Sequence, residues 1–566
     1  MQIRLGFFTV LIVGFLATGL SRAEWRPLPP RAATDQTPPE VRNVIMMIPD
    51  GCSQSMVTLA RWVHGGPLAV DQIQSGAVKT HSADNLVTDS AAAATALATG
   101  VKTANGTLGA APPQNAILRP SNLPYGAYQP LATLLEGAKQ SGRSAGLVVT
   151  VGAWEATPAA FAAHAVSRSS DCDIMQQLVH QDLDVVFGGG RQQLLPADAG
   201  GVRRDGQNLI EQLQKRGVQV IGDARAMERL TSGRAWGIFS PGSLSAEIDR
   251  AARTPDQPSL AQMTAKAIDL LKQNRKGFFL MVEGSQVDWA DHANDPARGV
   301  REFLAFDDAM AVALKFAAGE GQGQTLVLAC PDHDTGGMTI GHRARTPRTR
   351  ADLVDSMTRM QISTDLLAEK IGTNYTTATI AANVEAWWNI RLPDATAEEI
   401  TNRVAKGASM SSALMETAVR PQSAIGWTSG GHTGVDVPLW SYGPGRPIGL
   451  LDNTEVAQVA ARALRLNLPA LTRELFVDAQ KQFPAAQLDC ADPTHPVLTI
   501  GTARLPVNQN VLIQNGQEQR FRGVVVHIEK TGRTYLPQAA VNLISKHPIP
   551  PADRGGPGLP AAERAE

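Results

Sequence analysis

The feature that most constrains the fold is an alternation of short apolar runs with stretches of helical periodicity. Continuous apolar runs are typical of buried strands, and apolar residues spaced three or four apart are typical of helices. Strands separated by helices of this length predict crossover connections and a mostly parallel sheet, and hence an α/β fold. The predicted strands are residues 41–48, 144–150, 185–187, 278–282 and 325–329, and the predicted helices are residues 131–140, 260–273 and 303–316.

Two segments depart from this alternation. Residues 340–425 are polar and less regular, which indicates an inserted segment that serves as a lid or an interface. Short apolar runs within residues 497–543 predict β-hairpins and hence a small β-rich C-terminal extension. The predicted organisation is a signal peptide at 1–23, a linker at 24–39, a catalytic domain at 40–465, an extension at 466–547 and a disordered tail at 548–566.

The N-terminus has the pattern of an export signal. Arg4 precedes an apolar run at residues 5–20, and Ser21 and Ala23 supply small residues where a signal peptidase cleaves. An uncleaved membrane anchor is the alternative, although the run is short and interrupted by glycine. We therefore expect an exported protein, periplasmic or extracellular, with no membrane span once the signal is removed.

Charge and cysteine content exclude several classes of function. The 566 residues include 52 Lys and Arg against 53 Asp and Glu, so the net charge of −1 gives no footprint for nucleic acid. The four cysteines lie far apart and form no CxxC pair, which excludes a cysteine zinc site. One disulfide between distant segments stays open.

Polar residues follow the predicted strands, where ligands bind in open sheets of this kind. Asp50 ends an apolar run, and Ser90 precedes a run of alanines that forms a helix, so it lies at a helix N-terminus. Ser90 is either a helix cap or a nucleophile that faces the positive end of the helix. Because no G-x-S-x-G elbow surrounds it and no histidine lies near it in sequence, activation by a metal is the natural route.

Further polar residues with ligand chemistry recur along the chain. Thr157 could cap a turn or bind a hard cation, and Arg168 could lie free on the surface or clamp phosphate oxygens. Asp288 and His292 are four residues apart, so one helical turn places both on one face, as metal ligands require. The other candidates are Glu283, Asp332, His333 and, in a glycine-rich loop, His432.

Together these segments resemble the alkaline phosphatase family. The matching strings are IPDG (48–51), VTDSAAAATALATGVKT (87–103), EATPAAFAAH with SR (155–168), FFLMVEGSQVDWADH (278–292), CPDHDTGG (330–337) and SGGHTG (429–434). They occur in the order that the family has and cover residues of about 41–445. The resemblance implies a doubly wound sheet and a site with two Zn²⁺ and one Mg²⁺, and it leaves a homodimer open.

The resemblance also implies a role for each candidate. Ser90 becomes phosphorylated, Arg168 clamps the phosphate and Asp89 supports Arg168. One zinc is bound by Asp288, His292 and His432, the other zinc by Asp50, Asp332 and His333, and the magnesium by Asp50, Thr157 and Glu283. Two metal ions about 4 Å apart are a known device for in-line phosphoryl displacement.

This sequence departs from the family at three positions. Glu155 stands near the magnesium shell where relatives often have Asp or His, which implies a role around the ion without fixing a contact. Trp289 stands near the phosphate where others have Lys or His, so no charge is supplied there. Thr335 replaces a histidine that some members add.

We therefore expect an enzyme that hydrolyses small phosphate monoesters through a phosphoserine intermediate. A phosphodiesterase or sulfatase of the same superfamily is one alternative, but the sulfatase string C/S-x-P-x-R is absent at Ser90. A metal-binding or phosphate-binding protein without catalysis is the other, and the complete set of ligands and nucleophile argues against it.

Overall fold

A ten-stranded sheet is the centre of the computed structural model, which describes residues 41–341 and 346–546. Its strand order is β14-β2-β13-β8-β1-β7-β3-β4-β6-β5, and only β13 runs antiparallel to its neighbours. The strands in that order are Gly449–Asp452, Gln74–Lys79, Val437–Tyr442, Thr325–Ala329, Asn43–Pro49, Phe278–Gly284, Ser144–Gly152, Val185–Gly189, Ala235–Ile238 and Gln219–Ile221. The predicted mostly parallel α/β sheet is thus confirmed.

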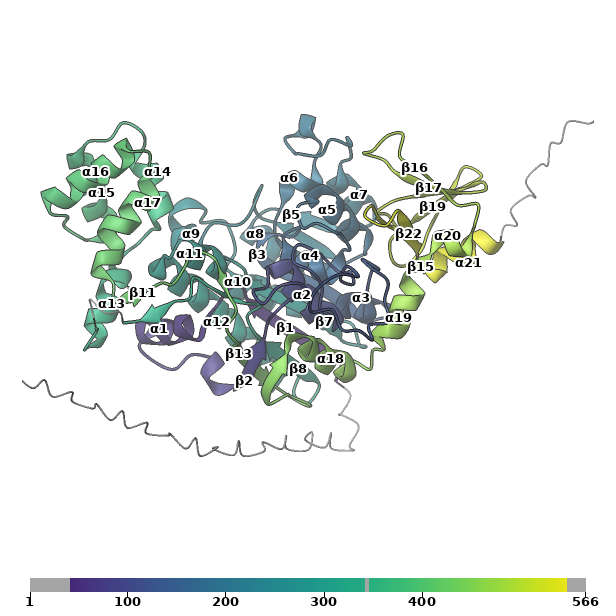
Figure 1. Ribbon diagram of the computed structural model, residues 1–566, viewed down its shortest axis with the longest axis horizontal. Coiled ribbons are helices and arrows are strands. Elements are labelled where there is room, and N and C mark those ends of the chain that lie inside the picture. The colour runs from purple at the N-terminus through teal and green to yellow at the C-terminus, as the bar shows by residue number, and fades with distance from the viewer. Residues whose placement is uncertain (1–40, 342–345, 547–566) are drawn as a thin grey trace, which may run out of the picture. The chain divides into compact units, whose positions relative to one another are not determined.

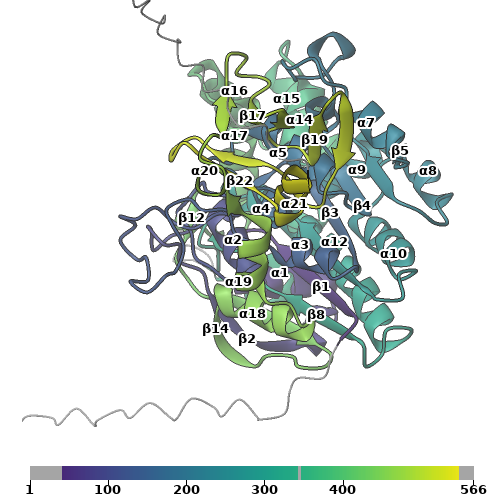
Figure 2. The ribbon, with the colours of Figure 1, turned by 90° about the vertical axis from the view of Figure 1, so that its right-hand side faces the viewer.

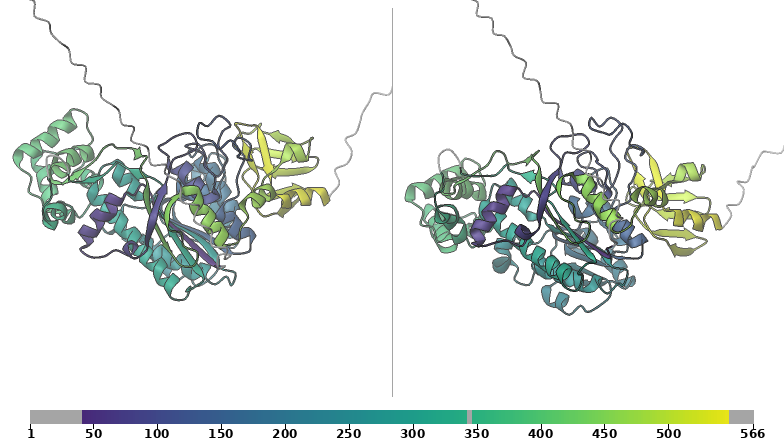
Figure 3. Two further views of the ribbon diagram at one scale, coloured as in Figure 1. Left: turned by 60° about the horizontal axis from the view of Figure 1, so that its bottom comes forward. Right: turned by 90° about the horizontal axis from the view of Figure 1, so that it is seen from below.

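Helices cover both faces of this sheet, as Figure 3 shows. Side chains of β1 alternate between two cores: Ile45 and Met47 pack on one face, and Val44, Met46 and Ile48 on the other. The first core includes α1 (Gln54–His64), α9 (Glu247–Arg253), α10 (Leu260–Leu271) and α12 (Pro296–Ala318). The second includes α2 (Ser90–Thr99), α3 (Leu134–Gln140), α4 (Ala156–Ala162), α5 (Asp171–His180), α7 (Leu209–Lys215) and α18 (Asn453–Ala463). The expected doubly wound arrangement is therefore present.

Residues 340–425 are more regular than the sequence indicated. They contain α13 (Arg350–Arg359), α14 (Thr364–Ile371), α15 (Thr377–Trp388), α16 (Asp394–Ala405) and α17 (Met410–Leu414), which Figure 1 shows in green. Ser363 and Thr376 cap α14 and α15, and the buried indole of Trp388 donates a 2.8 Å hydrogen bond to the carbonyl of Ile362. Caps and a few large apolar residues thus order a segment whose helix surfaces are otherwise polar.

This helical insertion leaves and re-enters the core at one place. Strands β10 (Thr339–Ile340) and β11 (Ile425–Gly426) pair antiparallel, so the ends of the insertion lie side by side. Next to them, β9 (Asp334–Thr335) pairs with β12 (His432–Thr433). The second pairing brings a late loop of the chain to the end of β8.

The C-terminal extension contains the predicted strands and has a core of its own. An antiparallel sheet is formed by β16 (Gln487–Asp489), β17 (Val497–Ile500), β18 (Ala503–Pro506), β19 (Val511–Gln514) and β20 (Gln517–Arg520). A smaller sheet and a helix are formed by β15 (Val477–Asp478), β22 (Arg533–Leu536), β21 (Val526–Ile528) and α21 (Gln538–Lys546). Figure 2 shows these strands following α19 (Leu468–Leu475).

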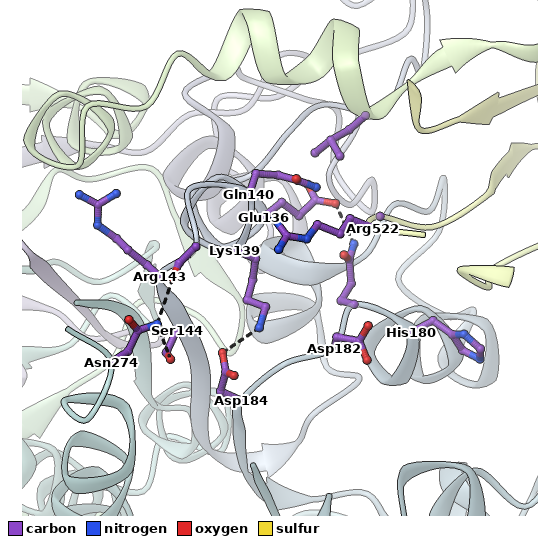
Figure 4. Close-up of a pocket in the computed structure, with 14 residues that line it drawn as sticks. Glu136, Lys139, Gln140, Arg143, Ser144, His180, Asp182, Asp184, Asn274 and Arg522 are labelled. Carbon is purple, nitrogen blue, oxygen red and sulfur yellow. Dashed lines mark hydrogen bonds and ion pairs between the residues drawn. The ribbon is translucent and has the colours of Figure 1, made fainter. Parts of the chain in front are cut away.

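Polar contacts fix the extension to α5 and the loop after it. The guanidinium of Arg520 donates to both carboxylate oxygens of Asp182, at 2.7 and 2.9 Å. The ring Nδ1 of His180 lies 2.8 Å from the amide oxygen of Asn510. A pocket of about 240 Å³ lies at this junction, where Lys139 pairs with Asp184 (Figure 4). None of the candidate site residues lines it, so it is separate from the predicted chemistry.

The remaining predictions concern the two terminal segments, a membrane span and a disulfide. The signal peptide, the linker and the tail at residues 548–566 lie outside the described residues. No helix among the residues that the structure describes is both long and apolar enough to cross a membrane. The four cysteines are unpaired, and Cys52 and Cys330 are buried.

Candidate functional site

The candidate residues converge because four neighbouring strands end at one edge of the sheet. These strands lie side by side in the order β8, β1, β7 and β3. Carboxyl ends of parallel strands meet at the same edge, which is where open α/β sheets bind ligands. The residues that follow or end them are Asp332 and His333 for β8, Asp50 for β1, Glu283, Asp288 and His292 for β7, and Glu155, Thr157 and Arg168 for β3.

Ser90 is the first residue of α2 and lies against this cluster. The carboxylate of Asp89 caps the helix by accepting from the amide of Ala92 at 3.0 Å, so the cap role belongs to Asp89. The hydroxyl oxygen of Ser90 lies 3.1 Å from Nε2 of His333, and only 3% of the residue is exposed. A hydroxyl at the positive end of a helix is placed to stabilise negative charge on itself or on a bound anion.

Asp288, His292 and His432 form the first group of possible metal ligands, with one ligand atom of each within 4.8 Å of the others. The Nε2 atoms of the two histidines are 3.2 Å apart, and that of His292 is 3.3 Å from the Asp288 carboxylate. Each Nδ1 faces a backbone carbonyl, that of Gly430 at 2.7 Å and that of Thr88 at 2.9 Å. Such carbonyls hold the proton on Nδ1 and direct the Nε2 lone pair to the cluster.

Protonation in this first group follows from its internal contacts. Burial acts to raise the pKa of Asp288, but the hydrogen bond from His292 and the neighbouring histidines bring it down to about 2. The same hydrogen bond raises the pKa of His292 to about 9. A cation bound here therefore has to displace a proton from His292, as is usual for histidine ligands.

The second group consists of Asp50, Asp332 and His333. Nε2 of His333 lies 3.2 Å from the Asp332 carboxylate and 3.5 Å from that of Asp50. Burial lowers the pKa of His333, which favours the neutral imidazole that metals bind. Asp288 completes a triad with Asp50 and His333, and the rings of His333 and His432 stack at 3.6 Å, so the two groups are contiguous.

Asp50, Thr157 and Glu283 are buried together beside the second group. Burial and the neighbouring Asp332 raise the pKa of Glu283 to about 8, against the hydroxyls of Ser285 and Thr157, which lower it. One carboxylate oxygen of Asp50 and one of Glu283 have no hydrogen-bond partner among the described residues. Buried oxygens of this kind are costly unless a cation binds them, so the donor set fits a hard ion such as Mg²⁺.

Arg168 lies beside Asp89 and Glu155. Its guanidinium nitrogens are 3.6 Å from the Asp89 carboxylate and 3.7 Å from the Glu155 carboxylate. The Asp89 oxygen that faces Arg168 also accepts from the amide of Gly106 at 2.9 Å, which fixes that carboxylate. Arg168 is about one-third exposed, so part of its guanidinium is open to a ligand.

Sequence analysis did not predict the contacts of Thr335, and it placed Trp289 near the phosphate. Thr335 donates a 2.5 Å hydrogen bond to the Asp288 carboxylate and lies 3.3 Å from Nδ1 of His333, so it joins the two groups. Its position two residues after His333 was the available signal. Trp289 remains 38% exposed and lines a pocket next to the cluster.

A buried serine lies at a helix N-terminus and faces histidines and carboxylates at the edge of a doubly wound sheet, and these groups are candidate metal ligands. This arrangement is typical of metal-dependent hydrolases. Comparison with known proteins identifies the family. The family model described as "Alkaline phosphatase" matches residues 41–466. The chain belongs to the alkaline phosphatase family, whose members are phosphoric monoester hydrolases.

Individual relatives support this assignment. Alkaline phosphatase 4 of Bacillus subtilis is 33% identical over 479 residues, which cover 81% of this chain and 96% of that protein. The crystal structure of a cold-active alkaline phosphatase from the psychrophile Shewanella sp. is 30% identical with a TM-score of 0.65, and covers 75% of this chain and 99% of its own. That of Thermus thermophilus alkaline phosphatase is 27% identical with a TM-score of 0.66, and covers 78% and 96%.

Proposed function

We propose that this protein hydrolyses phosphate monoesters through a phosphoserine intermediate at Ser90, with two Zn²⁺ and one Mg²⁺ bound. The observation that carries the proposal is the 3.1 Å approach of the Ser90 hydroxyl to His333 inside the cluster of ligands. The first zinc is assigned to Asp288, His292 and His432, and the second to Asp50, Asp332 and His333. The magnesium is assigned to Asp50, Thr157 and Glu283. When bound, the cations supply positive charge that favours the serine alkoxide and offsets charge on the phosphoryl oxygens.

The proposed reaction consists of two successive displacements at phosphorus, and residues of the chain take part in both. The Ser90 hydroxyl gives up its proton to solvent and its oxygen forms a bond to phosphorus while the bond from phosphorus to the alcohol oxygen breaks, and the departing alcohol oxygen takes up a proton. Water then attacks phosphorus, the bond to the Ser90 oxygen breaks, and inorganic phosphate and free serine result. Arg168 orients the phosphoryl oxygens in both steps, and Asp89 and Glu155 hold its guanidinium in place.

The test is release of phosphate from a simple aryl phosphate monoester at alkaline pH. We expect release by the full chain with Zn²⁺ and Mg²⁺, loss of release after chelation, and loss in Ser90→Ala. The exposed Ser232→Ala variant is the control and keeps activity. After an acid quench, mass spectrometry should find phosphate on Ser90. Metal-dependent release that persists in Ser90→Ala would show that another group is the nucleophile.

Three further expectations belong to this proposal. Export is expected from the apolar N-terminal run, and small phosphomonoesters are expected as substrates. Homodimerisation is a prediction from the family resemblance, and a sedimentation measurement on the full chain tests it.

A further inference from the structure

A pocket of about 700 Å³ lies against the helix that carries Asp288 and His292. This helix, α11 (Gln286–His292), directs residues 288 and 292 to the cluster, whereas Gln286 and Trp289, three residues apart, line the pocket. Residues three or four apart share a face of a helix, and Trp289 is three residues from both Gln286 and His292, so it lies between the pocket and the cluster. Because Trp289 directly follows the cluster residue Asp288, the wall of the pocket adjoins the cluster where a bound monoester is expected.

The helical insertion forms part of the wall. Arg298 donates to the side chain of Gln286 at 3.0 Å and to Asp365 of α14 at 3.3 Å, so it connects α11 with the insertion. Asp249, on α9, accepts from both the backbone amide and the hydroxyl of Ser363 at 2.7 Å. These contacts close one side of the pocket, and a volume of this size suits a small-molecule ligand.

The lining combines an aromatic surface with free polar groups. Trp289 is 38% exposed, and its indole is the one large aromatic surface that this helix presents to the pocket. The hydroxyl of Ser240 and the exposed carboxylate of Asp256 also line it, and neither group has a partner among the residues that the structure describes. An aromatic face beside free hydrogen-bonding groups suits a ring that carries hydroxyl groups, because the ring packs on the indole while its hydroxyls donate to the carboxylate.

The geometry points to a subsite for the alcohol portion of the substrate, which selects monoesters of polyhydroxylated rings such as sugar phosphates. The inference rests on the proposed phosphomonoesterase activity at Ser90. Trp289 packs against the ring, Asp256 and Ser240 accept or donate hydrogen bonds to its hydroxyls, and the insertion limits the space available. A residue that contacts only the alcohol portion affects which monoesters are preferred. The displacement at phosphorus depends on the residues of the cluster.

The experiment compares three esters of primary alcohols, so that the leaving groups are alike. The probes are glucose 6-phosphate, cyclohexylmethyl phosphate, which has a ring without ring hydroxyls, and ethyl phosphate, which has no ring. For the metal-loaded full chain we expect kcat/KM for glucose 6-phosphate to exceed that for ethyl phosphate by about tenfold. Trp289→Ala should lower the ratio of either ring ester to ethyl phosphate by about tenfold, and Asp256→Ala should lower only the ratio of glucose 6-phosphate to cyclohexylmethyl phosphate, by roughly fivefold.

Trp62→Ala is the matched control, because Trp62 is 49% exposed on α1 and does not line the pocket. All ratios should be unchanged in this variant. If the unmodified chain hydrolyses the three esters equally well, or if Trp289→Ala slows all three by the same factor, the subsite is refuted while the proposed function stands. If the metal-loaded chain hydrolyses none of them, nor an aryl phosphate, the proposed function fails and this inference fails with it.

Discussion

Replacing Glu283 by glutamine should stabilise the protein without its metals, and only at high pH. The buried Glu283 has a pKa of about 8 against an ordinary value of 4.5. For an acid whose pKa is raised by folding, stability is fully present below the unfolded value and is lost as pH rises through the folded value. The two pKa values differ by 3.5 units, and each unit corresponds to about 1.4 kcal/mol. The free energy of unfolding is therefore lowered by about 5 kcal/mol at pH 9. Relaxation of the surroundings reduces this, so we expect about 2–5 kcal/mol.

The assay is urea unfolding in the presence of a chelator, with tryptophan fluorescence as the signal. It compares the unmodified chain with Glu283→Gln. At pH 5 the two should differ by less than about 1 kcal/mol, because the carboxyl is protonated in the folded protein and pH 5 is only half a unit above its ordinary pKa of 4.5 in the unfolded chain. At pH 9 the variant should be the more stable, and added Mg²⁺ should reverse the order because only the carboxylate holds the ion. Glu474→Gln, at an exposed position, is the control. A difference that is the same at pH 5 and pH 9 would refute the reasoning, because it would mean that Glu283 ionises without cost.

One further prediction concerns a side chain of the cluster, and another concerns a contact of the helical insertion. Thr335→Val removes the hydroxyl that donates to Asp288 and should weaken zinc binding by about 10- to 100-fold, as measured by competition with a chromogenic chelator, whereas Thr335→Ser should keep the affinity. Asp249→Ala removes both contacts to Ser363 and should speed limited proteolysis within the helical insertion by roughly tenfold, and an unchanged rate would mean that other contacts hold the insertion.

The fold and the convergence of the candidates could be predicted from the sequence because they depend on local patterns. Strand β8 (Thr325–Ala329) begins and ends as predicted, since Gln324 precedes its apolar run and Pro331 follows soon after it. Helix α12 begins at Pro296, seven residues before the predicted start, because Asp295 caps it and proline is favoured in the first turn. The insertion was harder to predict, since its helices depend on caps and a small core more than on long apolar stripes.

The finer geometry of the site depends on contacts that have no signal in any one segment. The position of Thr335 between Asp288 and His333 follows from the pairing of β9 with β12, two strands of two residues each. Likewise, Trp289 lines a pocket together with residues of α9 and α14 that lie far from it in the sequence. The role of each site residue stays a prediction until the variants are measured.

The bond between His432 and the carbonyl of Thr88 joins residues that are 344 positions apart. A contact of this kind needs both segments, so the site cannot be complete before residue 432 has joined the chain. A chain that is still being synthesised therefore carries the serine and the first carboxylate long before it has the last histidine. Such an intermediate lacks a complete site, which ties the appearance of activity to the completion of folding.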